Sequence, residues 1–153
     1  RLRHEGRGGD APFVAPFNPG QVTVAEDYAA LVEWRAGSPL RCASLEGGRS
    51  GGGGSGLFID TFMDQGKWLA ELQRRIGDGV AMSPRRHMDR GNGRKAITVR
   101  VALDLLCLEG MAIKAILRRF GWVANMRECK DLRLAICGAL DRMQGYLDQR
   151  DAK

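Results

Sequence analysis

Five apolar residues near the end of the chain constrain its fold more than any other feature. Leu132, Ile136, Leu140, Met143 and Leu147 follow one another at intervals of four, four, three and four residues. These positions fall on one stripe of an α-helix, whereas the inward residues of a strand would recur at every second position. The stripe therefore predicts a long amphipathic helix over residues 128–147 that buries one face against other elements.

Two shorter helices are predicted immediately before this long one. Thr98 is a suitable N-cap for a helix that closes at Gly110. A second helix over 112–120 follows and stops at Gly121, and a turn then leads into the long helix. The last third of the chain is therefore expected to form three helices.

The first third contains one helix and a low-complexity string. Thr23, with Glu26 three residues later, matches a capping box, and Gly37 followed by Pro39 ends the helix that it begins. The Gly- and Ser-rich string over 47–56 cannot pack and predicts a flexible linker, either natural or introduced by engineering.

Between the linker and the last third, apolar residues recur at helical spacing over 57–76, and a polar, basic loop follows over 77–95. No segment shows a convincing alternation of apolar and polar residues. The sequence therefore predicts an all-α fold, a small bundle of about five helices. The expected divisions are an extended or disordered tail over 1–20, an N-terminal helix over 21–46, the linker over 47–56, and a helical domain over 57–150 with a helix-turn-helix-like part over 98–149.

Charge is distributed unevenly along the chain. The whole sequence has a net charge of +6, but residues 85–133 contain twelve Lys and Arg against five Asp and Glu, a local charge of +7. A positive surface on a nearly neutral scaffold favours a polyanionic partner, with nucleic acid the leading candidate. Charge alone does not separate DNA from RNA, from an acidic protein or from a role in solubility.

A short helix, a turn with a glycine and a longer helix together have the outline of a helix-turn-helix. In such a unit the N-terminal end of the second helix offers polar and basic groups to the major groove, while the first helix contacts phosphates. The residues expected to bind DNA or polymerase are Lys114, Arg118, Arg119, Arg127, Lys130 and Arg133. An accessory basic loop is expected from Arg85, Arg86, Arg90, Arg94 and Lys95. A solvated face of a structural domain, or a docking surface for protein, is the alternative interpretation.

Several apolar residues allow two interpretations. Trp122 either packs across the helix junction or is exposed as an interface anchor, and the core role is favoured. Phe13 and Phe17 dock either on the domain itself or on a partner. Met82, Met88, Met111 and Met126 are interpreted as residues that fill gaps in the core.

No residue pattern indicates catalysis or a cofactor. None of the four cysteines forms a C-x-x-C pair, and the two histidines, His4 and His87, lie far apart, so we expect no metal site and no cofactor. There is no nucleophile elbow or phosphate-binding loop, and the chain is not expected to be an enzyme. The absence of a disulfide framework favours the cytoplasm. No apolar run approaches the length of a membrane span, so no membrane role is expected.

The residues from Arg94 onward show a family resemblance. An Arg-rich entry is followed by VALDLLCLEGMAIKAILRRFGW, a short polar turn and LRLAICGALDRMQGYL. This pattern resembles the C-terminal domain of alphaproteobacterial helix-turn-helix proteins, and within it the transcriptional activators of phage-like gene transfer agents. The matching positions are scaffold positions, and Val123 stands where the family usually has proline.

The resemblance implies a transcriptional activator that binds promoter DNA, engages RNA polymerase and associates with the nucleoid. A phage-type packaging protein, similar to a small terminase subunit, is the alternative from another class. It would also be helical and basic but would form a ring. A structural protein-docking module is the third possibility.

Overall fold

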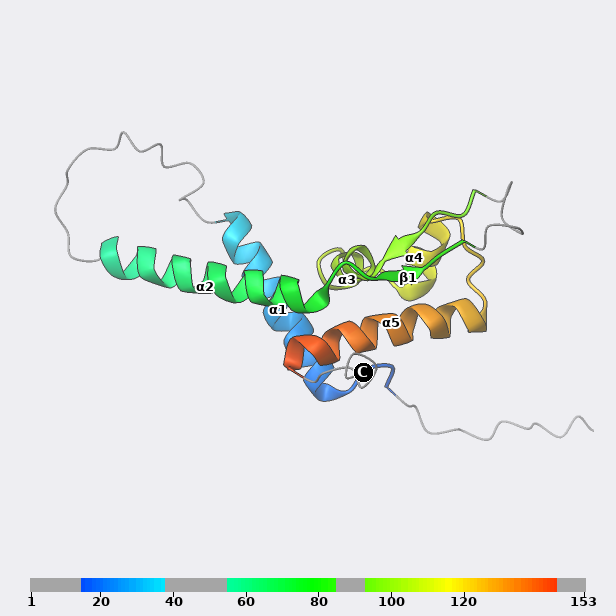
Figure 1. Cartoon of the computed structure of the whole chain (residues 1–153), viewed down its shortest axis with the longest axis horizontal. Coiled ribbons are helices and arrows are strands. Elements are labelled where there is room, and N and C mark those ends of the chain that lie inside the picture. Colours follow the sequence, from blue (N-terminus) through cyan, green and yellow to red (C-terminus); the bar gives the residue numbers. More distant parts are fainter. Residues whose placement is uncertain (1–14, 38–54, 85–92, 146–153) are drawn as a thin grey trace, which may run out of the picture.

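The structure is a computed structural model that describes residues 15–37, 55–84 and 93–145. Within this part of the chain it consists of helices and one two-stranded antiparallel sheet (Figure 1). The elements are α1 (Pro19–Gly37), α2 (Ser55–Ile76), β1 (Val80–Met82), β2 (Ile97–Thr98), α3 (Val99–Cys107), α4 (Ile113–Arg119) and α5 (Met126–Gln144). The predicted small all-α bundle is confirmed.

Helix α5 is the element against which the rest of the domain packs. It contacts all four other helices and β1. The inward side chains of the predicted stripe, Leu132, Ile136, Leu140 and Met143, are buried as expected, while Leu147 lies outside the described residues. Helix α5 begins at Met126, two residues before the predicted start, because the Asn125 side chain accepts a hydrogen bond from the Glu128 amide at 2.9 Å and caps the helix.

The N-terminal helix begins earlier than predicted. Asn18 and Gln21 form a reciprocal capping box, in which the Asn18 side chain accepts from the Gln21 amide at 2.8 Å and the Gln21 side chain accepts from the Asn18 amide at 3.1 Å. Pro19 occupies the first helical position, where proline is favoured. The prediction that Thr23 is the N-cap is wrong, since its hydroxyl donates to the Pro19 carbonyl within the helix.

Two hydrogen bonds between side chains join α1 to α5 and to α3. The buried Gln21 side chain donates through Nε2 to Asp141 of α5 at 2.8 Å, and the Tyr28 hydroxyl donates to Asp104 of α3 at 2.7 Å. Burial and the neighbouring carboxylate raise the pKa of Tyr28. Because the phenol stays protonated at neutral pH, it keeps its role as donor to Asp104.

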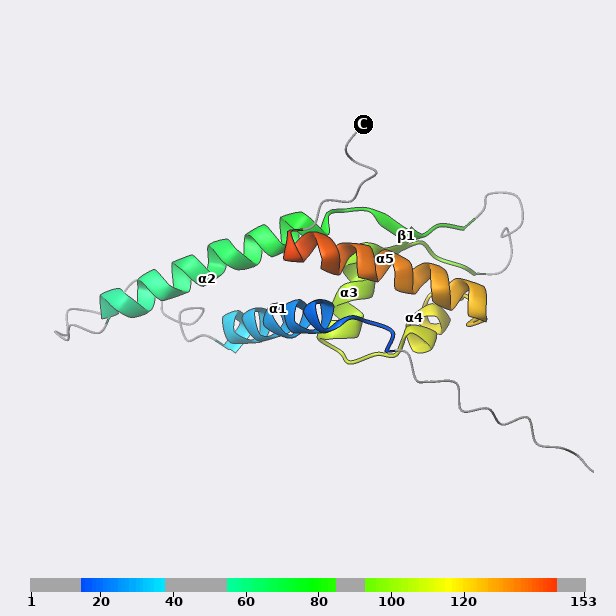
Figure 2. The ribbon, with the colours of Figure 1, turned by 90° about the horizontal axis from the view of Figure 1, so that it is seen from below.

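Helix α2 extends outward from the rest of the domain, and only its C-terminal end lies beside α5 (Figures 1 and 2). It starts at Ser55, so the last two residues of the predicted 47–56 linker are helical, while 47–54 lie outside the described residues. Helix α1 crosses α2 near Gly66, where the Arg35 guanidinium occupies the space that a Cβ would take. The Trp34 and Phe62 rings meet beside this crossing, with centroids 5.3 Å apart.

The short sheet corrects the prediction of a continuous loop over 77–95. Strand β1 pairs antiparallel with β2, with Val80 opposite Thr98, and the inward Met82 and Ile97 are buried. Strands of three and two residues are too short to produce a recognisable alternation in the sequence. Thr98 also caps α3 as predicted, accepting from the Val101 amide at 3.3 Å.

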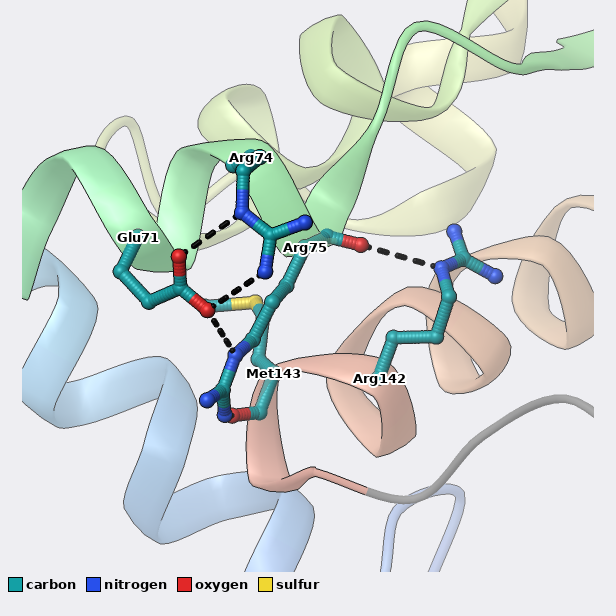
Figure 3. A network of polar contacts seen from close by, with 5 residues as sticks. All are labelled: Glu71, Arg74, Arg75, Arg142 and Met143. Carbon is teal, nitrogen blue, oxygen red and sulfur yellow. Dashed lines mark hydrogen bonds and ion pairs between the residues drawn. The ribbon is translucent and has the colours of Figure 1, made fainter.

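Two arginines join the C-terminal ends of α2 and α5 by capping each other's helix (Figure 3). Arg75 Nη1 donates to the Met143 carbonyl at 3.1 Å. In return, Arg142 donates to the carbonyls of Arg75 at 3.1 Å and Ile76 at 2.9 Å. These carbonyls lie in the last turns of their helices, where intrahelical partners run out and a cation also complements the helix dipole.

Glu71 orients one of these arginines and gives the junction a dependence on pH. Its carboxylate accepts from Arg75 Nε at 2.8 Å, from Arg74 Nε at 2.8 Å and from Arg74 Nη2 at 2.7 Å. These hydrogen bonds lower the pKa of Glu71 from 4.5 to about 2. A lowered pKa in the folded state means that the stabilisation is present above pH 4.5 and is lost as the pH falls toward 2.

We therefore expect Glu71→Gln to lower the Tm at pH 7, with the difference from the wild type disappearing as the pH falls toward 2. Thermal unfolding followed by circular dichroism at several pH values measures this. Asp64→Asn is the matched control, because Asp64 pairs with Lys67 in an exposed i,i+3 pair of the same helix and should contribute little. A difference at pH 7 that is equal for both variants would argue against the capping role.

Candidate nucleic-acid interface

The two helices of the predicted helix-turn-helix are present as α4 and α5, and they pack against each other. Helix α4 runs from Ile113 to Arg119, inside the predicted 112–120, and lies beside the N-terminal half of α5 (Figures 1 and 2). It ends in a Schellman motif: the Trp122 amide donates to the Leu117 carbonyl at 2.9 Å and the Gly121 amide to the Arg118 carbonyl at 3.0 Å. Gly121 has the positive φ of +76° that this motif requires.

Trp122 belongs to the core of this junction. Its side chain is only 8% exposed, and its indole Nε1 donates to the Lys95 carbonyl at 2.8 Å. The Lys95 amide donates in turn to the Phe120 carbonyl at 2.9 Å, and the Arg94 guanidinium lies 5.2 Å from the centre of the indole ring. The core interpretation of Trp122 is therefore supported, and its side chain is not an exposed anchor.

Most of the predicted binding residues of α4 and α5 are accessible. Lys114, Arg118 and Arg119 on α4 and Arg127 and Lys130 on α5 are exposed, and Arg133 is half-buried. Because α5 turns once in 3.6 residues, its exposed residues Arg127, Lys130 and Leu134 share one face, opposite the buried stripe.

Arg119 is less available than the other cations. Its Nη1 donates to Glu109 at 2.9 Å and lies 3.4 Å from the sulfur of Met111. The predicted phosphate contact of Arg119 would have to compete with this surface ion pair, which is weak because both side chains are half exposed.

The structure places part of the accessory basic loop. Arg94 and Lys95 lie at the junction of α4 and α5, Arg94 against the Trp122 ring and Lys95 exposed. The other three residues of that prediction, Arg85, Arg86 and Arg90, lie outside the described residues.

A groove that the sequence did not predict lies between α4 and the start of α5, with a volume of about 1000 Å³. Apolar side chains from four separate segments form most of its lining. The lining residues are Pro16, Phe17, Leu106, Ala112, Ile113, Lys114, Ala124, Asn125, Met126, Cys129, Lys130 and Arg133. Three of the six predicted binding residues thus border an apolar groove as well as the basic surface.

Two residues of the groove settle earlier alternatives. Phe17 packs against the core, as the interpretation of a tail laid on its own domain expects, while Phe13 lies outside the described residues. Met126 does not fill a core gap: its side chain is 89% exposed, so that prediction is wrong for this methionine. The turn places Met126 at the first position of α5, beyond the reach of the buried stripe.

The cysteines that the structure describes are half-buried free thiols. Burial, assisted by the neighbouring Asp104, raises the pKa of Cys107 to about 11, and burial raises that of Cys137 as well. These two thiols are therefore protonated at neutral pH and are poor nucleophiles. Within residues 15–37, 55–84 and 93–145, no three His, Cys, Asp or Glu side chains gather closely enough to hold a metal ion. Cys42 and both histidines lie outside these ranges.

None of the helices in the described part of the chain has the length and apolar character needed to cross a membrane. Comparison with protein-family models, with curated proteins and with solved structures finds no match to this chain. The geometry and charge of the α4–α5 unit are therefore the main structural observations that bear on function.

Proposed function

We propose that this domain is a non-enzymatic transcription regulator that binds double-stranded DNA through α4 and the N-terminal half of α5. The observation that supports the proposal most directly is the concentration of accessible cations on this helix pair. Between residues 112 and 133 there are six Lys and Arg against two acidic residues, Glu128 and Asp131. Exposed cations neutralise phosphates and release counterions, which drives DNA association.

The placement of the cations suits a division of roles. Arg118, at the end of α4, is suited to contact a DNA phosphate, because the first helix of such a pair crosses the DNA backbone. Arg127 and Lys130, in the first turns of α5, are suited to base edges in the major groove. Lys95, held at the junction by its bonds to Phe120 and Trp122, adds a cation from outside the helix pair.

The double variant Arg118→Ala with Arg127→Ala tests DNA binding. We expect affinity for a duplex to fall about tenfold or more at moderate salt, because two charge-assisted contacts are lost. The slope of log K against log salt should fall by about one for each phosphate contact removed. Fluorescence anisotropy with labelled promoter fragments measures both quantities.

Lys67→Ala with Arg74→Ala is the matched control, since it removes the same charge from exposed positions of α2. An equal loss in both double variants would show that only net charge matters, and the absence of duplex binding by the wild type at low salt would refute the DNA contact. A ring-shaped oligomer in light scattering would instead favour the packaging-protein alternative.

The proposal extends to RNA polymerase and to activation of phage-like gene transfer agent genes, since the resemblance of residues 94–147 implies a promoter-bound activator at the cytoplasmic nucleoid. Polymerase that the domain retains from an alphaproteobacterial lysate after nuclease treatment would support a direct contact. Polymerase that is lost on nuclease treatment would show that DNA alone bridges the two.

A further inference from the structure

The apolar groove is not explained by DNA binding. Its side chains include Ile113 of α4, Leu106 of α3 and Cys129 and Met126 of α5. Protein–DNA interfaces are polar and strongly charged, so this lining adds little to the recognition of a duplex. A volume of about 1000 Å³ is at the upper end of ligand pockets, and the groove is partly open to solvent and lined by residues of both α4 and α5.

Met126 is the most exposed of the large apolar side chains described, at 89%. Isolated exposed apolar residues are common, but Met126 borders an apolar groove instead of standing alone. Methionine is flexible and polarisable, and it is enriched on surfaces that adapt to apolar side chains of peptides.

The charges around the groove identify the class of occupant. Lys114, Lys130 and Arg133 line it, and no lining residue carries a carboxylate. Each of these three cations lacks an ion pair with any other described residue. An occupant with apolar anchors flanked by Asp or Glu would complement both the apolar lining and the cations.

Two other occupants fit poorly. A second copy docked through a symmetric interface would bring the same cations together, and like charges in contact are unfavourable. The chain's own first fourteen residues contain Arg1, Arg3 and Arg7 against Glu5 and Asp10, so they too have a net positive charge. Charge complementarity therefore favours a different, acidic protein.

We propose that the groove between α4 and α5 binds an acidic amphipathic helix of a partner protein. The partner helix would insert apolar side chains at i, i+3 or i+4 and i+7 beside Ile113, Met126 and Cys129, the usual pattern of a helix in a groove. Its carboxylates would pair with Lys114, Lys130 and Arg133. This goes beyond DNA binding, although Lys130 belongs to both proposed surfaces.

A panel of synthetic helical peptides of about 16 residues tests the proposal, with Leu and Phe at these spacings and Glu on the remaining face. We expect binding to the whole domain that weakens about tenfold when the Glu residues become Gln and disappears when they become Lys. Met126→Gln should weaken binding at least fivefold. Leu134→Gln, the matched control on the same helix but outside the groove, should leave binding unchanged.

The two functions separate in the same assays. Met126→Gln should leave duplex affinity intact, while Arg118→Ala with Arg127→Ala should lose the duplex and keep the peptide, since neither arginine lines the groove. The proposal is overturned if no peptide binds, if the Glu, Gln and Lys peptides bind equally, or if the Leu134 control loses as much as Met126→Gln. It is also overturned if Met126→Gln weakens duplex and peptide binding alike, because the groove would then belong to the DNA interface.

Discussion

Replacing Gly121 by alanine is expected to destabilise the domain by about 3 kcal/mol, because the residue meets two separate requirements. Its φ of +76° lies in the left-handed region, which costs a residue with a Cβ about 1–2 kcal/mol. A Cβ there would also lie 2.7 Å from the Gly93 carbonyl oxygen and 3.1 Å from its carbon. Those are backbone atoms, so the whole 93–95 segment would have to move.

That movement would disturb the hydrogen bonds from Lys95 to Phe120 and from Trp122 to Lys95. Each of these two hydrogen bonds contributes about 1 kcal/mol to stability. Their loss, added to the cost of the left-handed φ, accounts for the expected destabilisation. Gly110→Ala is the matched control, since Gly110 has a similar φ of +63° but no atom within 4 Å of the added Cβ. It should cost about 1 kcal/mol in urea unfolding. Equal losses of stability in Gly121→Ala and Gly110→Ala would mean that the backbone around Gly93 moves away from the added Cβ without cost.

The consequence for function is that the Gly121 junction positions basic residues from two parts of the sequence. It ends α4 beside Arg118 and it holds Arg94 and Lys95 against Trp122. If the proposed DNA contact exists, a variant that loosens the junction should therefore weaken it as well as lower stability. The sequence assigned Arg94 and Lys95 to a loop, and nothing in it showed that this loop is fixed.

The boundaries of α3 and α4 were predictable to within three residues because local chemistry determines them. Thr98 caps one helix and Gly121 ends the other through bonds between residues that are close in sequence. The same local rule gives the wrong start at Thr23, because Asn18 and Gln21 form a capping box five residues earlier. The sequence alone does not show which of two possible N-cap residues is used, because the choice depends on where the first helical turn begins.

The groove could not be predicted from the sequence, since its walls come from Phe17, Leu106, Ile113 and the start of α5. Only tertiary packing brings these segments together. Met126 is the clearest example. Its apolar, flexible side chain suggested a residue that fills a gap in the core, but its position at the start of α5 exposes it. The cluster of basic residues is visible in the sequence, but the sequence does not show which of them border the groove.

The orientation of α5 underlies both proposed surfaces, and two leucines on that helix test it. Leu132 is fully buried in the stripe, whereas Leu134, two residues later, is 55% exposed on the face that includes Arg127 and Lys130. Leu132→Ala removes buried methyl groups and leaves a cavity among the helices packed on α5. We expect a loss of about 3–4 kcal/mol in urea unfolding.

Leu134→Ala is the same chemical change on the other side of the helix, and it should cost less than about 1 kcal/mol. The difference in stability between Leu132→Ala and Leu134→Ala depends mainly on the rotation of α5 about its axis, because both residues lie in the same helical turn. If the two variants lose equal stability, α5 is rotated or slipped from the position described. Arg127 and Lys130 would then no longer share the outer face, and both the DNA surface and the groove would have to be reassigned.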